Sequence, residues 1–208
     1  MFLTDGSPKS KLTLILAHGA GGAMDTPWMT KMARAIAAHD IRVLRFEFPY
    51  MAARREGKKS GAPDREPVLL DAWRSVVGET GNDVFVGGKS MGGRMASMVA
   101  DELEVAGLVC LGYPFHPPGA PEKLRTKHLE KLKTRTLIVQ GERDPFGTRD
   151  DVAQYKLSKS IRIEWLEDGD HSFKPRKSSG FSEAAHLQRA ADAVAEFIRT
   201  ASPSVVVV

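Results

Sequence analysis

The sequence predicts an α/β domain built on a mostly parallel, doubly wound sheet of about six or seven strands. Short runs of apolar and β-branched residues alternate with longer segments of helical periodicity along the 208 residues. The apolar runs are nearly continuous, which is typical of strands covered by helices on both faces. No repeat and no change in composition marks a second domain, so one domain over residues 1–208 is expected.

Strands and helices are expected in regular alternation. The expected strands are 12–18, 41–48, 84–88, 105–112, 135–141 and 161–167, and the expected helices lie near 27–39, 66–78, from about 91, 121–132, 149–158 and 183–200. The connection from strand 105–112 to strand 135–141 holds about two dozen residues. No large cap domain fits there, and an open site is expected.

Two segments fall outside this alternation. Residues 49–67 form a long connection rich in glycine, proline and charge, and long loops of this kind are often functional. The final SVVVV is compatible with an added strand, a packed tail or a disordered end.

Composition favours a protein of the cytoplasm. The opening MFLTDGSPKSK lacks the apolar stretch of a secretory signal, and no later run approaches the roughly 20 residues of a membrane helix. The only cysteine, Cys110, forms no internal disulfide and is expected to be a buried structural thiol. The formal charge of +4 is modest, and no aromatic-rich basic surface accompanies it. Neither a membrane nor a nucleic-acid partner is expected, and nothing indicates a homo-oligomer.

The clearest motif is a GxSxG pattern centred on Ser90, between an apolar strand and a helix. A serine on such a sharp turn has a strained backbone, and small neighbours are needed to present its hydroxyl above the carboxyl end of the sheet. Gly88, Gly92 and Gly93 provide that room. Ser90 is therefore a candidate nucleophile. The alternative is a glycine-rich turn whose serine only caps the following helix.

Two nucleotide-binding patterns are incomplete. Gly88, Lys89 and Ser90 spell the end of a phosphate-binding loop, but Asp83 stands where that motif needs its first glycine. The segment GAGGAM has Met24 at the last glycine position of a dinucleotide fingerprint. Nucleotide binding is therefore disfavoured.

A serine nucleophile needs a histidine base, and the histidine needs a carboxylate that fixes its tautomer. In this type of sheet the acid follows the strand two places after the serine strand, and the histidine follows the next strand. Asp144 and His171 occupy those places, just beyond RTLIVQ and IRIEWLE. Both are expected at the same sheet edge as Ser90.

Each partner has an alternative interpretation. Asp144 precedes a proline and could simply form a turn, and His171 could be an ordinary loop histidine. Asp168 and Asp170 compete for the acid role, but they share the histidine's own loop, and Glu142 is a weaker competitor.

Two backbone amides are expected to bind the developing oxyanion. Met91, which follows the nucleophile, would supply one. The glycine-rich segment LAHGAGG follows the first expected strand, so Ala20 or Gly21 would supply the other and His18 would shape the loop. The alternative is an ordinary strand-to-helix turn.

The substrate pocket is less well defined by the sequence. The segment GYPFHPPG follows strand 105–112, so Tyr113, Phe115 and His116 are candidate lining residues, although its prolines could equally just stiffen a loop. Lys89, Arg94 and the basic segment 54–59 could favour acidic esters, and ordinary surface charge pairing explains them equally well.

The segments LAHGAGG, GGKSMGGR, QGERDPFG and GDHSF together resemble the α/β-hydrolase superfamily over nearly the whole chain, particularly its small dienelactone-hydrolase-like members. FPYMAARREG, GGKSMGGR and GYPFHPPG are similar to the hydrolase-like group of testis-expressed protein thirty and subunit three of the NSL complex. The resemblance implies a single-domain α/β-hydrolase fold with Ser90, Asp144 and His171 as its triad. Dienelactone hydrolases proper use cysteine as nucleophile, so dienelactone itself is not the expected substrate.

The sequence thus predicts a serine hydrolase of the carboxylesterase type, which cleaves a small-molecule ester through an acyl-enzyme. No metal and no organic cofactor is expected. The alternative is a catalytically weak or inactive binding or scaffold protein, because some relatives in the narrower group belong to regulatory assemblies and fold alone does not establish turnover.

Overall fold

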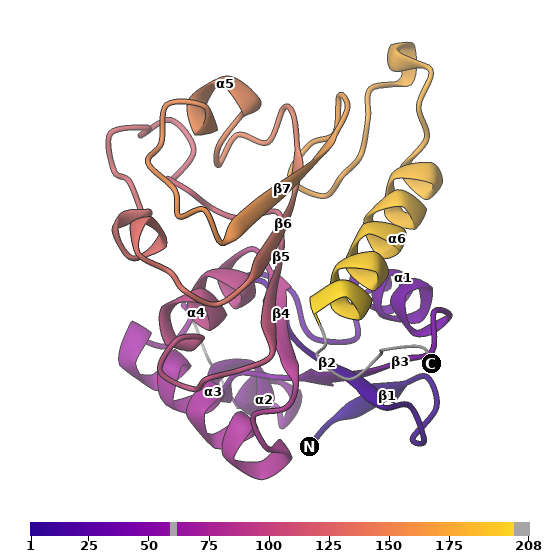
Figure 1. Cartoon of the computed structure of the whole chain (residues 1–208). Coiled ribbons are helices and arrows are strands. Elements are labelled where there is room, and N and C mark those ends of the chain that lie inside the picture. Colours follow the sequence, from indigo (N-terminus) through magenta and orange to yellow (C-terminus); the bar gives the residue numbers. More distant parts are fainter. Residues whose placement is uncertain (59–61, 202–208) are drawn as a thin grey trace.

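The computed structural model describes residues 1–58 and 62–201, with a seven-stranded sheet at the centre (Figure 1). The strand order is β1-β3-β2-β4-β5-β6-β7, and every neighbouring pair is parallel except β1 with β3. The strands are β1 (Leu3–Asp5), β2 (Leu12–Ala17), β3 (Ile41–Phe46), β4 (Phe85–Lys89), β5 (Gly107–Leu111), β6 (Thr136–Gly141) and β7 (Ile161–Leu166). Their parallel arrangement brings the loops after β2, β4, β6 and β7 to one edge of the sheet.

Helices cover both faces of the sheet (Figure 1). Helices α1 and α6 pack against each other on one face, and α3 packs against α2 and α4 on the other. The helices are α1 (Pro27–Ala37), α2 (Pro49–Arg55), α3 (Glu66–Thr80), α4 (Met91–Val99), α5 (Arg149–Val152) and α6 (Glu183–Ala201), with short 3₁₀ turns η1 (Lys127–Glu130) and η2 (Lys177–Ser179). This is the doubly wound arrangement predicted from the sequence.

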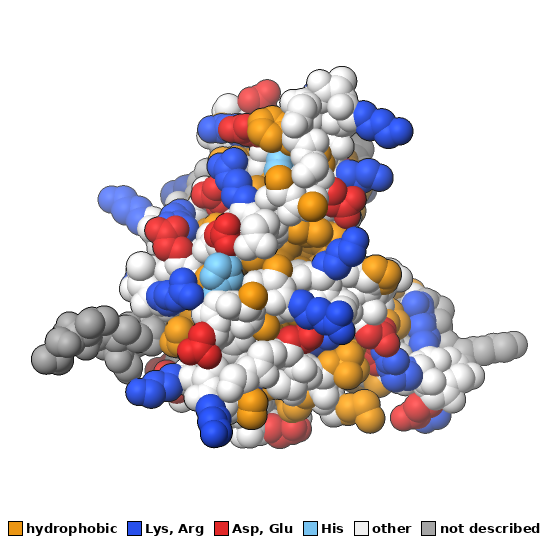
Figure 2. Space-filling model, turned by 90° about the vertical axis from the view of Figure 1, so that its right-hand side faces the viewer, with side chains coloured by type: hydrophobic (Ala, Val, Ile, Leu, Met, Phe, Trp, Pro, Cys, Tyr) orange, Lys and Arg blue, Asp and Glu red, His pale blue; other side chains and the backbone are white. Residues whose placement is uncertain are grey.

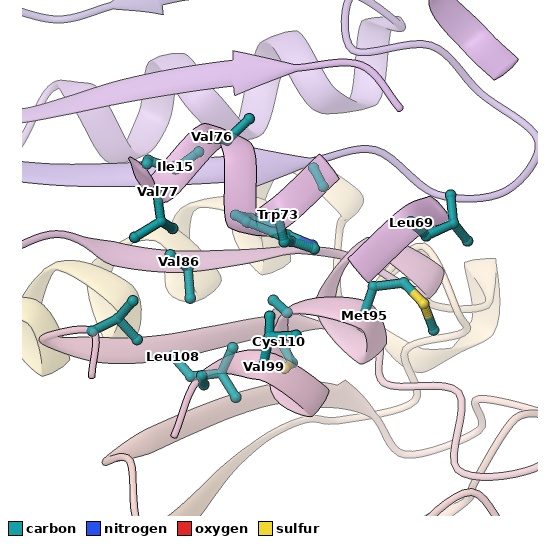
Figure 3. Close-up of a cluster of buried hydrophobic side chains, with 14 of the residues drawn as sticks. Ile15, Leu69, Trp73, Val76, Val77, Val86, Met95, Val99, Leu108 and Cys110 are labelled. Carbon is teal, nitrogen blue, oxygen red and sulfur yellow. The ribbon is translucent and has the colours of Figure 1, made fainter. Parts of the chain in front are cut away.

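Two layers of buried side chains, one on each face, hold the helices to the sheet. Figure 3 shows Trp73 and Val77 of α3 directed toward the strands, near Val86 of β4. Cys110 lies in the same cluster with 1% of its surface exposed, so the prediction of a buried structural thiol is confirmed. Both faces of β4 and β5 are covered, which is why these strands have nearly continuous apolar sequences.

Two expected helices are much shorter than predicted. Within 121–132 only the turn η1 forms, because Leu124 is 50% exposed and only Leu129 and Leu132 reach the core. So few buried side chains do not stabilise a helix of that length. Within 149–158 only α5 forms, a four-residue helix closed by a capping box between Thr148 and Asp151.

Two elements were not expected. Helix α2 begins at Pro49 inside the predicted long loop, with Tyr50 and Met51 buried. Proline at the first helical position is a common start signal, and it was present in the sequence. The other is β1, which has only three residues and joins the sheet antiparallel at its edge.

The connection from β5 to β6 contains only η1, as expected for a fold without a large cap.

The visible surface carries a mixture of charges. On the side where α1 and α6 lie, Lys and Arg side chains are interspersed with Asp and Glu (Figure 2). Within residues 1–58 and 62–201, no helix combines the length and the apolar character needed to span a bilayer. The SVVVV tail and Lys59 of the basic segment lie outside the described residues.

Candidate active site

Ser90 occupies the turn between β4 and α4 with a positive backbone φ of 51° and ψ of −116°. A non-glycine residue in such a conformation stores strain of about 1–3 kcal/mol, which the surrounding structure must impose. The Ser90 amide donates to the carbonyl of Leu111 at 3.0 Å, which ties the turn to β5. The Ser90 hydroxyl makes no capping hydrogen bond to α4, so the helix-cap interpretation of this serine is not supported.

The glycines around Ser90 allow the helix to pass very close to β2. A Cβ atom on Gly92 would lie 2.6 Å from the carbonyl oxygen of Ala17 and 2.7 Å from that of His18. A Cβ atom on Gly88 would also collide with the Ala17 oxygen. Because the opposing atoms belong to the backbone, no side-chain rotation relieves the contact. The GxSxG pattern is thus a packing requirement of this turn.

His171 and Asp144 are in direct contact. Their Nδ1 and Oδ2 atoms lie 2.7 Å apart, with Asp144 fully buried and the His171 side chain 23% exposed. Gln140 donates to the same carboxylate oxygen at 2.9 Å, and the Phe146 amide donates to Oδ1 at 2.9 Å. A carboxylate facing Nδ1 fixes the proton there and leaves Nε2 as the acceptor. This is the tautomer that a general base requires.

The competing carboxylates are engaged elsewhere. Asp168 and Glu142 form ion pairs with arginine side chains. Asp170 accepts hydrogen bonds from backbone amides within its own loop. Asp144 is the carboxylate that contacts His171.

Lys89 forms a hydrogen bond with the loop that carries His171. Its Nζ donates to the carbonyl of His171 at 2.6 Å and lies 5.4 Å from the ring centroid of Trp28. Burial lowers the pKa of Lys89 to about 8, against a partial opposing effect of Asp144. Lys89 is only 9% exposed and does not line the pocket beside Ser90, so it is not placed for direct contact with an acidic ester there.

The loop after β2 is shaped by His18, which has no exposed surface. Its Nε2 accepts from the Phe48 amide at 3.1 Å, so Nδ1 carries the proton and donates to the Gly19 carbonyl at 2.7 Å. Burial lowers the pKa of His18, which keeps the ring neutral. The Tyr50 hydroxyl donates to the Ala20 carbonyl at 2.8 Å. These bonds give His18 the loop-shaping role expected of it.

A pocket of about 370 Å³ opens beside Ser90, within the size range of small-molecule sites. Ala20, Ser90 and Met91 all line it, whereas Gly21 does not. Met91 begins α4, and the first amides of a helix have no partner within the helix. The remaining lining residues are Pro63, Asp64, Glu66, Leu69, Arg94, Met95, Pro114, Arg125 and Phe146.

The prediction that Tyr113, Phe115 and His116 line this pocket is wrong. Tyr113 and Phe115 have no exposed surface and belong to the hydrophobic core, and His116 is 4% exposed. From this segment Pro114 reaches the pocket instead. The two rings gain more from packing in the core than from facing a partly open cavity.

The basic segment is largely paired on the surface. Arg55 binds Glu47, and Lys58 binds Glu56, which lies two residues before it. Arg54 lies over the ring of Tyr50. None of the three basic residues lines the pocket beside Ser90.

Gln140 is a site residue that sequence reasoning missed. It is fully buried at the end of β6, where its amide nitrogen donates to Asp144 and its Oε1 accepts from the Tyr113 amide at 2.7 Å. The sequence did contain a signal for Gln140, which is a polar residue in an otherwise apolar strand. Such a side chain is buried only where it forms hydrogen bonds with other polar groups. Phe146 was also missed, and its ring centroid lies 4.3 Å from that of His171.

The strand order, with a strained serine turn after the central strand β4, is the arrangement of α/β hydrolases. A family model described as alpha/beta hydrolase domain matches residues 10–199, and the chain belongs to this family.

Solved structures share the fold at low sequence identity. A Xanthomonas campestris protein described as an α/β serine hydrolase without lid has a TM-score of 0.70 and 20% identity, over 97% of this chain and 88% of that one. Est1E from Butyrivibrio proteoclasticus, solved with ferulic acid, has a TM-score of 0.71 and 16% identity, over 96% and 94%. A Paleococcus ferrophilus monoacylglycerol lipase has a TM-score of 0.70 and 14% identity, over 97% and 99%.

Proposed function

We propose that this chain is a serine hydrolase that cleaves a carboxylic ester, or a related acyl bond, through a covalent acyl-enzyme. The observation that carries the proposal is the 2.7 Å contact between His171 Nδ1 and the buried Asp144, at the sheet edge where Ser90 lies on its strained turn. Nucleophile, acid and base follow one another along the chain in the order that this fold requires.

In the proposed first half-reaction, Nε2 of His171 removes the proton of Ser90 as its hydroxyl oxygen attacks the acyl carbonyl. The amide of Met91 and that of Ala20 or Gly21 bind the negative oxygen of the tetrahedral intermediate. Between these two, Ala20 is favoured because it lines the pocket with Met91. His171 then gives its proton to the leaving alcohol.

In the second half-reaction, His171 takes a proton from water as the water oxygen attacks the acyl carbon. His171 then returns this proton to the Ser90 oxygen as the acyl–oxygen bond breaks and the carboxylic acid leaves. Asp144 stays ionised throughout, supported by hydrogen bonds from Gln140 and the Phe146 amide. These steps use protein groups and water alone.

Solved structures that share the fold include one described as an esterase domain, from Rhodothermus marinus, and one described as a monoacylglycerol lipase, and this supports a small-molecule ester as substrate. The segments FPYMAARREG, GGKSMGGR and GYPFHPPG support the further proposal that the chain is related to the group of testis-expressed protein thirty and NSL-complex subunit three. A cytoplasmic location is proposed on the lone, buried thiol of Cys110.

Pre-steady-state hydrolysis of 4-nitrophenyl butyrate tests the proposal. An acyl-enzyme releases nitrophenol in a burst that approaches one equivalent per chain when deacylation is the slower step. Ser90→Ala should abolish both burst and turnover, whereas Ser75→Ala, an exposed serine on α3, should change neither. If the folded chain hydrolyses no ester in a panel of acyl lengths, the binding or scaffold alternative replaces the proposal.

A further inference from the structure

The pocket beside Ser90 contains two arginines that differ in their partners. Arg94, one turn along α4 from Ser90, donates to Glu66 at 2.8 Å. Arg125 also lines the pocket, but within the described part of the chain its guanidinium has neither a hydrogen bond nor an ion pair. An arginine that lines a cavity and is not paired with a carboxylate is available to bind an anion.

The acidic residues of the same pocket already have partners. Glu66 binds Arg94, and Asp64 accepts a hydrogen bond from the Tyr50 amide at 2.8 Å. Burial lowers the pKa of Arg125, and the charge of Arg94 lowers it further, but a guanidinium stays protonated under these conditions. The positive charge of Arg125 is thus left without a partner among the residues described.

The backbone of Arg125 is fixed by the two aromatic residues that sequence reasoning assigned to the pocket. The Arg125 amide donates to the Phe115 carbonyl at 2.8 Å, and the Tyr113 hydroxyl lies 3.4 Å from the Arg125 carbonyl as its donor. Both rings are fully buried. The core therefore holds the start of the Arg125 side chain in place.

The other arginine of the pocket, Arg94, also has a donor without a partner. The Nε of Arg94 is buried and has no hydrogen-bond partner among the described residues, although its Nη2 binds Glu66. Buried guanidinium donors are rarely left unpaired in a folded protein. Both arginines of the pocket therefore retain unused donors.

We propose that Arg125 binds a carboxylate of the substrate, so that Ser90 acts on esters with a negative charge in the acyl or alcohol part. The inference rests on the proposed function and names its substrate class. A planar guanidinium binds a carboxylate through two parallel hydrogen bonds. A monoanion suits this pocket better than a phosphate dianion, because the carboxylates of Asp64 and Glu66 also line it and repel additional negative charge.

The test compares kcat/KM for two ester pairs, each matching a carboxylate ester with its neutral methyl-terminated analogue. One pair has the charge in the acyl part and the other in the alcohol part. The unmodified chain should prefer the carboxylate member of at least one pair. Arg125→Gln should lower kcat/KM for that member by roughly 10–100-fold more than for its neutral analogue, so that the preference for the carboxylate is lost.

Two further variants sharpen the test. Arg125→Lys keeps the charge but loses the planar fork, and should give an intermediate preference. Arg162→Gln, on β7 and 49% exposed, removes a surface arginine that pairs with Glu196 and should change neither ester. Equal unfolding midpoints for these variants would show that folding is unaffected.

An unchanged preference in Arg125→Gln, with ester hydrolysis still dependent on Ser90, would overturn this inference alone. If the unmodified chain turns over none of the esters, the proposed function fails. A ligand-binding measurement then tests separately whether Arg125 binds a carboxylate. Monomethyl glutarate, but not dimethyl glutarate, should then raise the thermal midpoint of the unmodified chain and not that of Arg125→Gln. Equal shifts in both proteins would contradict the carboxylate site.

Discussion

Nδ1 of His171 lies 2.7 Å from Oδ2 of Asp144, a carboxylate with no exposed surface that also accepts hydrogen bonds from Gln140 and the Phe146 amide. Three donors around one buried carboxylate balance the cost of burying its charge. Gln140 donates to Oδ2, the oxygen that faces the imidazole, and the Phe146 amide holds the other oxygen, Oδ1. The orientation of His171 therefore depends on β6 and the loop after it.

Asp144→Asn should lower kcat for an ester substrate by about 10⁴, because an amide in this position favours the wrong tautomer of His171. The substitution keeps the shape of the side chain, so the measurement is kcat on a protein of unchanged fold. Asp168→Asn is the matched control. Asp168 lies in the loop of His171 but binds arginines, and its loss should leave kcat largely intact. Equal effects of the two changes would contradict the role given to Asp144.

Lys89→Met should change how stability depends on pH. The pKa of buried Lys89 is lowered to about 8 from 10.5, so between these values the unfolded chain binds more protons than the folded one. The free energy of unfolding contributed by this residue therefore rises from pH 8 to pH 10.5, and the burial penalty is fully present below pH 8. Lys89→Met should remove this rise, measured by urea unfolding at several pH values.

The control for that measurement is Lys156→Met, since the side chain of Lys156 is 85% exposed. Its profile should be parallel to that of the unmodified chain. Lys89→Met should also lower kcat, because it removes the 2.6 Å hydrogen bond to the His171 carbonyl. Parallel pH profiles for the Lys89→Met variant and the unmodified chain would argue against a strongly desolvated lysine.

Gly92→Ala should destabilise the fold strongly, by several kcal/mol, because its Cβ would meet two backbone oxygens of the β2 end at 2.6 and 2.7 Å. Gly78→Ala is the helical control. No atom lies within 4 Å of a Cβ at Gly78 in α3, so alanine there should raise the free energy of unfolding by about 0.5–1 kcal/mol. Denaturant unfolding measures both. A well-tolerated alanine at Gly92 would refute the close approach of α4 to β2.

The strands and the candidate site residues were predictable because their signals are local. Continuous apolar runs identified the six main strands, and Ser90, Asp144 and His171 each stand just after one of them. Parallel strands bring their carboxyl ends to one edge, so order along the chain was enough to expect them there together. Helix α2 and β1 were missed because short elements carry few periodic residues.

The pocket was not predictable in the same way. Tyr113 and Phe115 follow a strand, and sequence alone does not show whether such rings face a cavity or the core. A lysine is usually exposed, so the burial of Lys89 could not be read from its type. Arg125 lies in a segment expected to be helical, and its place in the pocket depends on tertiary contacts with the loop that follows β5.

The most direct test of the proposed nucleophile is intact-mass analysis after treatment with a fluorophosphonate, which phosphonylates activated serines. The unmodified chain should gain one adduct, Ser90→Ala should gain none, and His171→Ala should react far more slowly because Ser90 loses its base. Absence of an adduct on correctly folded protein, or an adduct that persists in Ser90→Ala, would contradict the assignment of Ser90 as the activated nucleophile.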